Sequence, residues 1–250
     1  MISVICVYNN KEILENCLLE SIKNQTTKAE LILLDNREGR FKSAAEALNY
    51  GGEQAKGKYL MFIHQDMILK SYLCIEKVER ILDKLANFGV VGVAGKYKNA
   101  KEVITNIEHG IPKKAAGEIH IKKPEKVQTV DECLIIIPKT VFGILRFDEK
   151  VCSDWHLYAV DYCLSVKRLG FDSYVIPMFA YHKSLAYSMS KEYFIVLKKI
   201  IKKHKNYYKM IYTTVGNWST VYPVCISRVY FYSRKRVGKL LRKTIRKVAQ

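Results

Sequence analysis

The sequence predicts an α/β fold, with a mostly parallel sheet flanked by helices and a basic helical tail at the C-terminus. Short apolar runs alternate with segments of helical periodicity over roughly the first 180 residues, which is the pattern of strand–helix–strand units with right-handed crossovers. Several of these runs stop abruptly at polar side chains, as buried strands do at the ligand-binding edge of an open α/β sheet.

The charge distribution separates the tail from the rest of the chain. The net charge is +18, yet residues 193–250 hold 15 Lys and Arg and no acidic residue. The 27 basic residues among the first 192 are nearly balanced by the 24 acidic ones. We therefore expect two units, a nearly neutral domain of residues 1–188 and a basic extension of residues 189–250 that contacts something anionic.

Composition and cysteine usage indicate a globular protein of a reducing compartment. With 250 residues, of which 49% are hydrophobic and 26% charged, the chain can bury a sizeable core. Seven Cys occur without a CxxC pair, which leaves a zinc knuckle or a dithiol redox motif without support. Met1 runs directly into an apolar, strand-like segment, so we expect no secretory signal and a cytoplasmic location.

The expected elements follow from the periodicity of apolar residues and from Asn, Gly and Pro at the breaks. Strands are expected at residues 2–8, 31–34, 59–63, 90–94, 133–137 and 174–176. Helices are expected at residues 11–24, 44–55, 70–87, 158–169 and, in the tail, 193–205. Residues 96–126 are polar and Lys-rich, so we expect an irregular excursion beside the sheet, with a small hairpin near residues 118–121.

Three of the expected strands end in side chains that can bind ligands. The first ends at Tyr8-Asn9, the second at Asp35-Asn36 and the third at His64-Gln65-Asp66. Asp66 alone has a simpler interpretation as the N-cap of the following helix, since Asp is a favoured cap. Three such endings along one sheet edge instead indicate a cleft.

Six segments occur in an order that resembles a known enzyme family. They are ISVICVYNN with CLLESIKNQ behind it, LILLDN, AAEALNYGGEQAKGKYLMFIHQD, WHLYAVDYCLSVKRLG and YVIPMFAYHKS. Together they are similar to the sugar-nucleotide-dependent glycosyltransferases of family 2, which have the Rossmann-like GT-A fold. The resemblance covers about residues 1–188. It implies inverting transfer of a sugar from a nucleotide-diphosphate sugar to a glycan or lipid-linked acceptor, in the synthesis of surface polysaccharide or glycoconjugates.

The resemblance also implies a metal and a donor site. Asp66 matches the metal-binding last residue of the family's Asp-x-Asp motif, and His182 matches a His that approaches the metal or the diphosphate. A divalent cation, Mn²⁺ or Mg²⁺, would neutralise the charge of the leaving group. A lone His in a loop is equally explained as a solvated residue. The residues implied in binding a UDP- or dTDP-sugar are Tyr8, Asn9, Asp35, Asn49, His64 and Gln65.

Two positions depart from the family pattern. His64 stands where the family has the first acid of its metal motif, and Ala159 stands at the position of the expected catalytic base. The nearby substitutes for the base are Asp154, His156 and Asp161, and we favour Asp154 if the helix starts early enough to turn it toward the cleft. The alternatives are that Asp154 caps this helix and that Asp161 holds it to its neighbours. Asp131 and Trp155 are expected to bind the acceptor.

The tail has the composition of a membrane-associating segment. Aromatic residues of the type found at membrane interfaces occur at Tyr212, Trp218, Tyr222 and Tyr230. Residues 237–248 combine an apolar stripe with basic residues on the remaining faces, which indicates an amphipathic helix on an anionic leaflet. We expect a peripheral protein at the inner face of the cell membrane. The alternative is that the stripe packs on the domain or on a second copy in a homo-oligomer.

Two other functions compete with glycosyl transfer. The missing acid at position 159 is compatible with a catalytically silent relative that binds a sugar nucleotide. The basic, Tyr-rich tail is compatible with nucleic-acid binding through phosphate contacts and base stacking. A cleft lined by carboxylates would repel a phosphodiester, so we do not expect nucleic acid as a partner.

Overall fold

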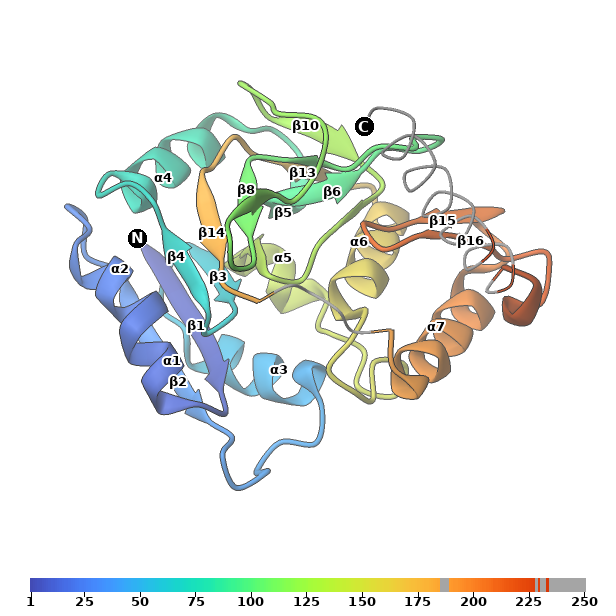
Figure 1. The fold of residues 1–250 in the computed structure, drawn as a ribbon, viewed down its shortest axis with the longest axis horizontal. Coiled ribbons are helices and arrows are strands. Elements are labelled where there is room, and N and C mark those ends of the chain that lie inside the picture. Colours follow the sequence, from blue (N-terminus) through green and yellow to red (C-terminus); the bar gives the residue numbers. More distant parts are fainter. Residues whose placement is uncertain (185–188, 228, 230–232, 234–250) are drawn as a thin grey trace, which may run out of the picture.

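A seven-stranded sheet forms the centre of the molecule (Figure 1). The computed structural model describes residues 1–184, 189–227, 229 and 233. The strands of the sheet are, in chain order, β1 (Ile2–Tyr8), β2 (Glu30–Asp35), β3 (Tyr59–Ile63), β5 (Phe88–Gly92), β10 (Glu125–Val127), β12 (Leu134–Pro138) and β13 (Asp172–Val175). Their order in space is β10-β13-β5-β12-β3-β1-β2. β12 runs antiparallel between β3 and β5, and β10 runs antiparallel beside β13. The remaining pairs are parallel, so the expected mostly parallel sheet is confirmed.

Helices cover both faces of the sheet because its strands are apolar on both sides. The helices are α1 (Lys11–Leu14), η1 (Glu15–Leu19), α2 (Glu20–Lys23), α3 (Ala44–Gln54), α4 (Cys74–Lys84), α5 (Lys139–Ile144) and α6 (Tyr158–Arg168). Ile2, Val4 and Cys6 of β1 face one core, with the continuous α1–η1–α2 helix and α4. Ile5 faces the other core, with α3, α5 and α6. Each large apolar side chain buried in these cores contributes about 1.5–3 kcal/mol to stability.

The polar segment expected to be irregular contains several short strands. One small sheet has the strand order β4-β14-β8-β9, made of β4 (Met67–Leu69), β14 (Ala180–His182), β8 (Ile107–His109) and β9 (Lys114–Ala115). Another has the order β11-β6-β7, made of β11 (Thr129–Val130), β6 (Ala94–Lys96) and β7 (Ile104–Thr105). The predicted hairpin near residues 118–121 is wrong: Ile119 makes a parallel bridge to Ile104, and the hairpin joins β8 to β9.

The structure excludes the capping alternative for Asp66 and corrects the expected loop position of His182. Asp66 is followed at once by strand β4, and α4 begins only at Cys74. Asp66 therefore caps no helix. His182 does not lie in a loop, because it is the last residue of β14 and pairs with Met67 of β4.

The described part of the tail packs on the domain. It contains α7 (Lys191–His204), close to the helix expected there, and the hairpin β15 (Met210–Tyr212)–β16 (Asn217–Ser219). Apolar side chains of α7 pack against α6, and the fully buried Trp218 lies in the same cluster. Tyr212 is also buried and Tyr222 is 62% exposed, so of these three only Tyr222 can face a membrane. Tyr230 and the predicted helix at residues 237–248 lie outside the described residues. Among the described residues, no helix combines the length and apolarity needed to cross a bilayer.

Asp161 of α6 binds two side chains of α7 and so holds the two helices together. Its carboxylate accepts hydrogen bonds from Lys203 (2.7 Å) and His204 (2.8 Å) of α7. Burial alone would lower the pKa of Lys203, but Asp161 and Asp148 raise it above the usual value, so the lysine stays charged. Asp161 is only 3% exposed and lies at a helix–helix contact. Its placement as a catalytic residue is therefore corrected to a structural role, the alternative raised from the sequence.

Replacing Asp161 should destabilise the protein strongly. Asp161→Asn leaves Lys203 without its full counter-charge in a partly buried site, which costs roughly 3 kcal/mol or more. Urea unfolding should show a correspondingly lower midpoint. The matched control is Asp154→Asn, since the Asp154 side chain accepts a hydrogen bond from the adjacent Trp155 amide in a turn (2.5 Å). Equal midpoints for the two variants would contradict this role of Asp161.

Candidate functional site

The polar strand ends meet at one edge of the sheet, where β1 and β3 end and β12 begins. Because β12 is antiparallel to β3, its first residues lie at the same edge as the end of β3. The amide of His64 donates to the carbonyl of Cys133 there (3.0 Å). Two cavities open at this edge, with volumes of about 500 and 340 Å³. His64, Asp66 and Trp155 line both, so the two cavities share a boundary.

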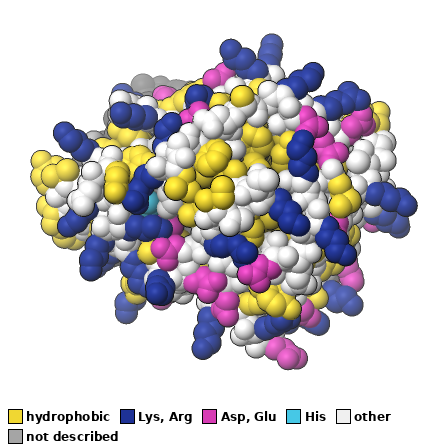
Figure 2. All heavy atoms as spheres, turned by 180° about the vertical axis from the view of Figure 1, so that it is seen from behind, with side chains coloured by type: hydrophobic (Ala, Val, Ile, Leu, Met, Phe, Trp, Pro, Cys, Tyr) yellow, Lys and Arg dark blue, Asp and Glu magenta, His cyan; other side chains and the backbone are white. Residues whose placement is uncertain are grey.

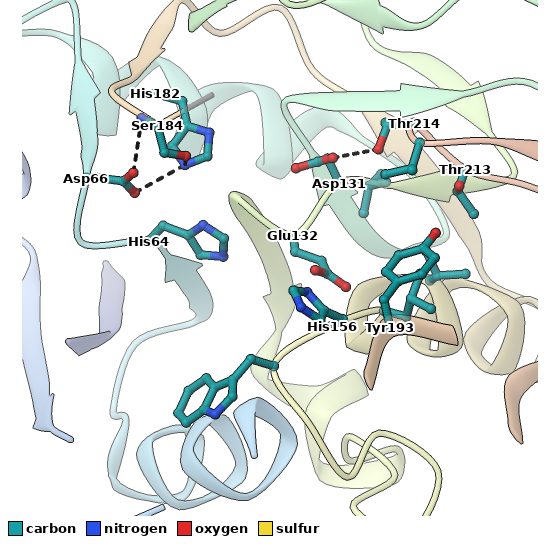
Figure 3. A pocket seen from close by; sticks show the side chains of 15 residues that line it. His64, Asp66, Asp131, Glu132, His156, His182, Ser184, Tyr193, Thr213 and Thr214 are labelled. Carbon is teal, nitrogen blue, oxygen red and sulfur yellow. Dashed lines mark hydrogen bonds and ion pairs between the residues drawn. The ribbon is translucent and has the colours of Figure 1, made fainter. Parts of the chain in front are cut away.

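His64, Asp66 and His182 form a compact cluster at this boundary (Figure 3). His182 Nε2 lies 3.1 Å from Asp66 Oδ1, and the rings of His64 and His182 are 5.6 Å apart between centroids. The other oxygen of Asp66 accepts a hydrogen bond from the Ser184 amide (3.2 Å). The Lys183 amide donates to the Asp66 carbonyl (3.0 Å). The end of β14 therefore fixes the carboxylate that the end of β3 presents.

A second contact fixes the orientation of the His64 ring. The Tyr158 hydroxyl donates to the carbonyl of Glu132 (3.0 Å) and also lies 3.2 Å from His64 Nε2. Since the hydroxyl hydrogen is used by the carbonyl, the Tyr158 oxygen accepts the hydrogen of Nε2. The lone pair of His64 is then on Nδ1. Hydrogen bonds of this kind set the tautomer and orientation of metal-binding histidines.

The charge states of the cluster follow from its environment. Burial lowers the pKa of His64 to about 4, with a further lowering by His182. Burial would raise the pKa of Asp66, but the hydrogen bond and charge of His182 outweigh it and lower the value to about 2. Burial would lower the pKa of His182, but Asp66 raises it above the usual value. At neutral pH the cluster therefore has an ionised carboxylate and a neutral His64.

These residues fit a divalent metal ion. Their ligand atoms lie within 4.8 Å of one another, a spacing that one ion can bridge. The neutral imidazole of His64 and the ionised carboxylate of Asp66 are in the protonation states that metal binding requires. Two imidazoles and one carboxylate suit an ion of the Mn²⁺ type better than Mg²⁺, which prefers oxygen ligands. His64 thus joins the two predicted ligands, Asp66 and His182.

The smaller cavity lies beside the end of β1. Tyr8, Asn9, Gln65 and Trp155 are among the residues that line it. Gln65 Oε1 accepts hydrogen bonds from the backbone amides of Asn9 (3.1 Å) and Asn10 (3.0 Å). Its Nε2 donates to the Asn9 side chain (2.7 Å). Gln65 therefore ties the end of β3 to the end of β1 and shapes this cavity.

The larger cavity extends from the cluster toward α6 and α7. Asp131, Trp155, His156 and Tyr193 line it, together with the segment Thr213–Val215 that follows β15. The Thr214 hydroxyl donates to Asp131 (2.6 Å), so the chain beyond residue 188 closes the far wall. Figure 3 shows Asp131, Tyr193 and Thr214 across the cavity from His64 and Asp66.

Comparison with known proteins identifies the family. A model of a glycosyltransferase-like family matches residues 3–212. The chain belongs to this family. The match confirms the glycosyltransferase resemblance, while inversion and assignment to family 2 stay predictions. It also extends past residue 188 into α7 and β15. A relative from Fuscovulum blasticum, named ATP synthase subunits region ORF 6, is 25% identical over 182 residues, covering 66% of this chain and 68% of the relative.

Solved glycosyltransferases share the fold, which is of the GT-A type. The structure is similar to GalNAc-T7 with UDP, GalNAc and Mn²⁺, with a TM-score of 0.57 and 12% identity over 82% of this chain and 47% of that one. It is also similar to residues 1–349 of TarS from S. aureus in complex with UDP-GlcNAc, with a TM-score of 0.57 and 15% identity over 82% of this chain and 66% of that one. The chain thus spans less than two thirds of both proteins.

The structure places most of the site residues predicted from the sequence in the two cavities, but not all of them. Tyr8, Asn9, His64, Gln65, Asp66, Asp131, Trp155, His156 and His182 line one or both cavities. Asp35 lies at the adjacent strand end, where Arg37 holds both carboxylate oxygens (3.0 and 2.6 Å) and lowers its pKa. Its neighbour Asn36, rather than Asp35, lines the smaller cavity.

Asn49 and Asp154 require correction. Asn49 is buried, and its side chain donates to the Phe147 carbonyl (2.9 Å) and Glu149 (2.8 Å) and accepts from the Phe147 amide (3.0 Å). It joins α3 to a loop and lines neither cavity. Asp154 also lines neither, because Leu157, with a left-handed φ of 65°, starts the helix too late to turn Asp154 inward. Asp154 is not the cap either, since Leu157 holds that position.

Sequence reasoning missed Glu132, Tyr158 and Tyr193. Glu132 and Tyr193 line the larger cavity, and Tyr158 orients His64. Glu132 carried a usable signal, because an acidic pair directly before a buried strand ends up at the active edge when that strand is antiparallel. The sequence around Tyr193 gave no sign of its place in the cavity, since that place depends on how α7 packs on α6.

Removing the Tyr158 hydroxyl should weaken metal binding. Tyr158→Phe frees the His64 ring, and loss of such an orienting hydrogen bond typically costs 10–100-fold in metal affinity. Titration calorimetry with Mn²⁺ measures this change. Tyr162→Phe is the matched control, because Tyr162 is on the same helix and donates to the Leu145 carbonyl (3.1 Å) without touching the cluster. The orienting role is refuted if both variants bind Mn²⁺ like the wild type.

Proposed function

We propose that the protein is a metal-dependent glycosyltransferase that moves a sugar, with inversion, from a UDP- or dTDP-sugar to a glycan or lipid-linked acceptor. The observation that carries this proposal is the metal-compatible cluster at the boundary of two cavities. The smaller cavity is suited to the nucleotide and the larger one to the transferred sugar and the acceptor. The diphosphate between them would then lie at the cluster. The bound UDP and Mn²⁺ of GalNAc-T7 support this interpretation.

The chain's own residues would have distinct tasks in this reaction. Asp66, His64 and His182 would hold the metal ion, which supplies positive charge against the departing diphosphate. Gln65 and Asn9 keep the floor of the smaller cavity rigid for the nucleotide. Trp155, shared by both cavities, presents an aromatic face near the junction where the sugar must lie. Asp131, held by Thr214, presents a carboxylate to acceptor hydroxyls.

Thermal unfolding tests the donor and metal together. A ligand at 100 times its Kd stabilises the native state by about 2.7 kcal/mol, which should raise the Tm by roughly 5–10 °C for a chain of this size. We expect this shift with Mn²⁺ plus a UDP- or dTDP-sugar, and its loss with EDTA or in Asp66→Ala. Asp83→Ala, at a surface ion pair with Lys58, should keep the shift. No shift with any of these donors would contradict the proposed function.

We further propose that the C-terminal end of the protein binds the cytoplasmic face of an anionic membrane, which brings a lipid-linked acceptor of surface polysaccharide synthesis to the larger cavity. Val221, Tyr222, Ile226 and Val229 are each more than half exposed. Figure 2 shows hydrophobic side chains at this end of the molecule, on the left of that view, with Lys and Arg around them. Such a combination of apolar and basic groups favours an anionic bilayer surface.

Vesicle flotation tests membrane binding. The full chain should float with phosphatidylglycerol-containing vesicles and much less with pure phosphatidylcholine. Combined Arg234→Glu, Lys235→Glu and Arg236→Glu should abolish flotation, since each basic residue near the surface contributes about 1 kcal/mol. The control reverses the same number of exposed charges elsewhere, at Lys23, Lys28 and Lys77. Equal loss in both variants would rule out a specific role of the C-terminal segment.

A further inference from the structure

Glu132 presents a carboxylate to the larger cavity from the turn that precedes β12. In Figure 3 it lies between the His64–Asp66–His182 cluster and Tyr193. The backbone amides of Leu157 and Tyr158, at the start of α6, donate toward this carboxylate. Its Oε1 atom is buried and has no hydrogen-bond partner among the described residues.

A buried carboxylate in this state is costly. Among the described residues, no Lys, Arg or His forms an ion pair with Glu132. Unpaired buried charges and unsatisfied polar atoms destabilise a fold. Capping α6 does not require the acid, because an uncharged Ser or Asn would serve. An acid kept at this cost in the wall of a cavity, with one buried oxygen that has no partner among the described residues, indicates a functional group.

We propose that Glu132 is the general base of the reaction, taking the place of the acid that is absent at Ala159. The inference rests on the proposed glycosyl transfer. Ala159 is completely buried in the core under α6 and does not line the larger cavity. Glu132 reaches the start of the same helix from the turn before β12. Its distance from the metal cluster is fixed through the Tyr158 hydroxyl, which contacts both the Glu132 carbonyl and His64.

The environment makes Glu132 a stronger base than an exposed carboxylate. Burial raises the pKa of Glu132 well above its usual value, Asp131 raises it further, and the helix amides oppose the shift. The other titratable groups that interact with it are Tyr158, Tyr193 and Cys152. These three are neutral at pH 7, since burial raises the pKa of each. A carboxylate with a raised pKa holds an abstracted proton more strongly than an exposed one does.

The step balances without another reactant. The acceptor oxygen forms a bond to the anomeric carbon as the bond from that carbon to the diphosphate oxygen breaks. The electron pair of the broken bond leaves with the nucleoside diphosphate. The proton of the acceptor hydroxyl passes to the Glu132 carboxylate. Water can replace the acceptor, which gives hydrolysis of the donor.

Donor hydrolysis by the full chain, with Mn²⁺ and UDP- or dTDP-sugars, tests the assignment. Glu132→Gln keeps the acceptor for the Leu157 and Tyr158 amides but cannot take the proton. We expect turnover to fall by at least 100-fold, with donor affinity in the thermal-shift assay unchanged within twofold. The control is Glu53→Gln, at a surface glutamate that pairs with Arg146 and lines neither cavity, and it should retain the wild-type turnover.

A second variant separates chemistry from structure. Glu132→Ala should regain turnover when sodium formate is added, whereas sodium chloride should have no effect, because a small carboxylate can enter the space and accept the proton. A purely structural role would not respond to formate. Turnover above a tenth of wild type in Glu132→Gln would overturn the assignment, as would an equal loss of turnover in Glu53→Gln. A wild-type protein that neither binds nor hydrolyses any of these donors would instead refute the glycosyltransferase function itself.

Discussion

The contact between Asp66 and His182 depends on pairing between segments that are far apart in the sequence. Asp66 leaves the sheet at the end of β3, and His182 reaches it because β14 pairs with β4 directly after the turn. Ser184, 118 residues further along the chain, completes the same carboxylate's hydrogen bonds. Closing so long a loop costs conformational entropy, which the two apolar cores on either face of the sheet offset. The cluster is therefore a product of the whole sheet rather than of a local motif.

The features that the sequence predicted are local ones. The strand Tyr59–Ile63 is apolar throughout and ends at polar residues, so its burial and its end point follow from composition alone. The helix at Tyr158–Arg168 follows from its periodicity and from Gly170, which adopts a φ of 92° just after it. The mostly parallel sheet follows from the alternation of these two kinds of segment.

The features that the sequence did not predict depend on distant partners. Asp161 looks the same in sequence whether it faces a cleft or Lys203, and the packing of α7 decides between them. Asn49 has a polar side chain that could bind a ligand, but it donates a hydrogen bond to the carbonyl of Phe147 in a loop. The antiparallel direction of β12 brings Glu132 to the active edge. Periodicity along a single sequence does not give the direction or the partners of such pairings.

The two cavities draw on different parts of the chain. The smaller cavity is lined by residues between Val7 and Asp66, with Trp155 as the single later contributor among the described residues. The far wall of the larger cavity comes from residues 130–132 and from Tyr193 to Val215. Changes in the C-terminal third can therefore reshape one cavity while leaving the other intact. With the donor and acceptor sites proposed above, such a division would allow new acceptors to be recruited onto an unchanged donor site, and it offers a junction for chimeric enzymes.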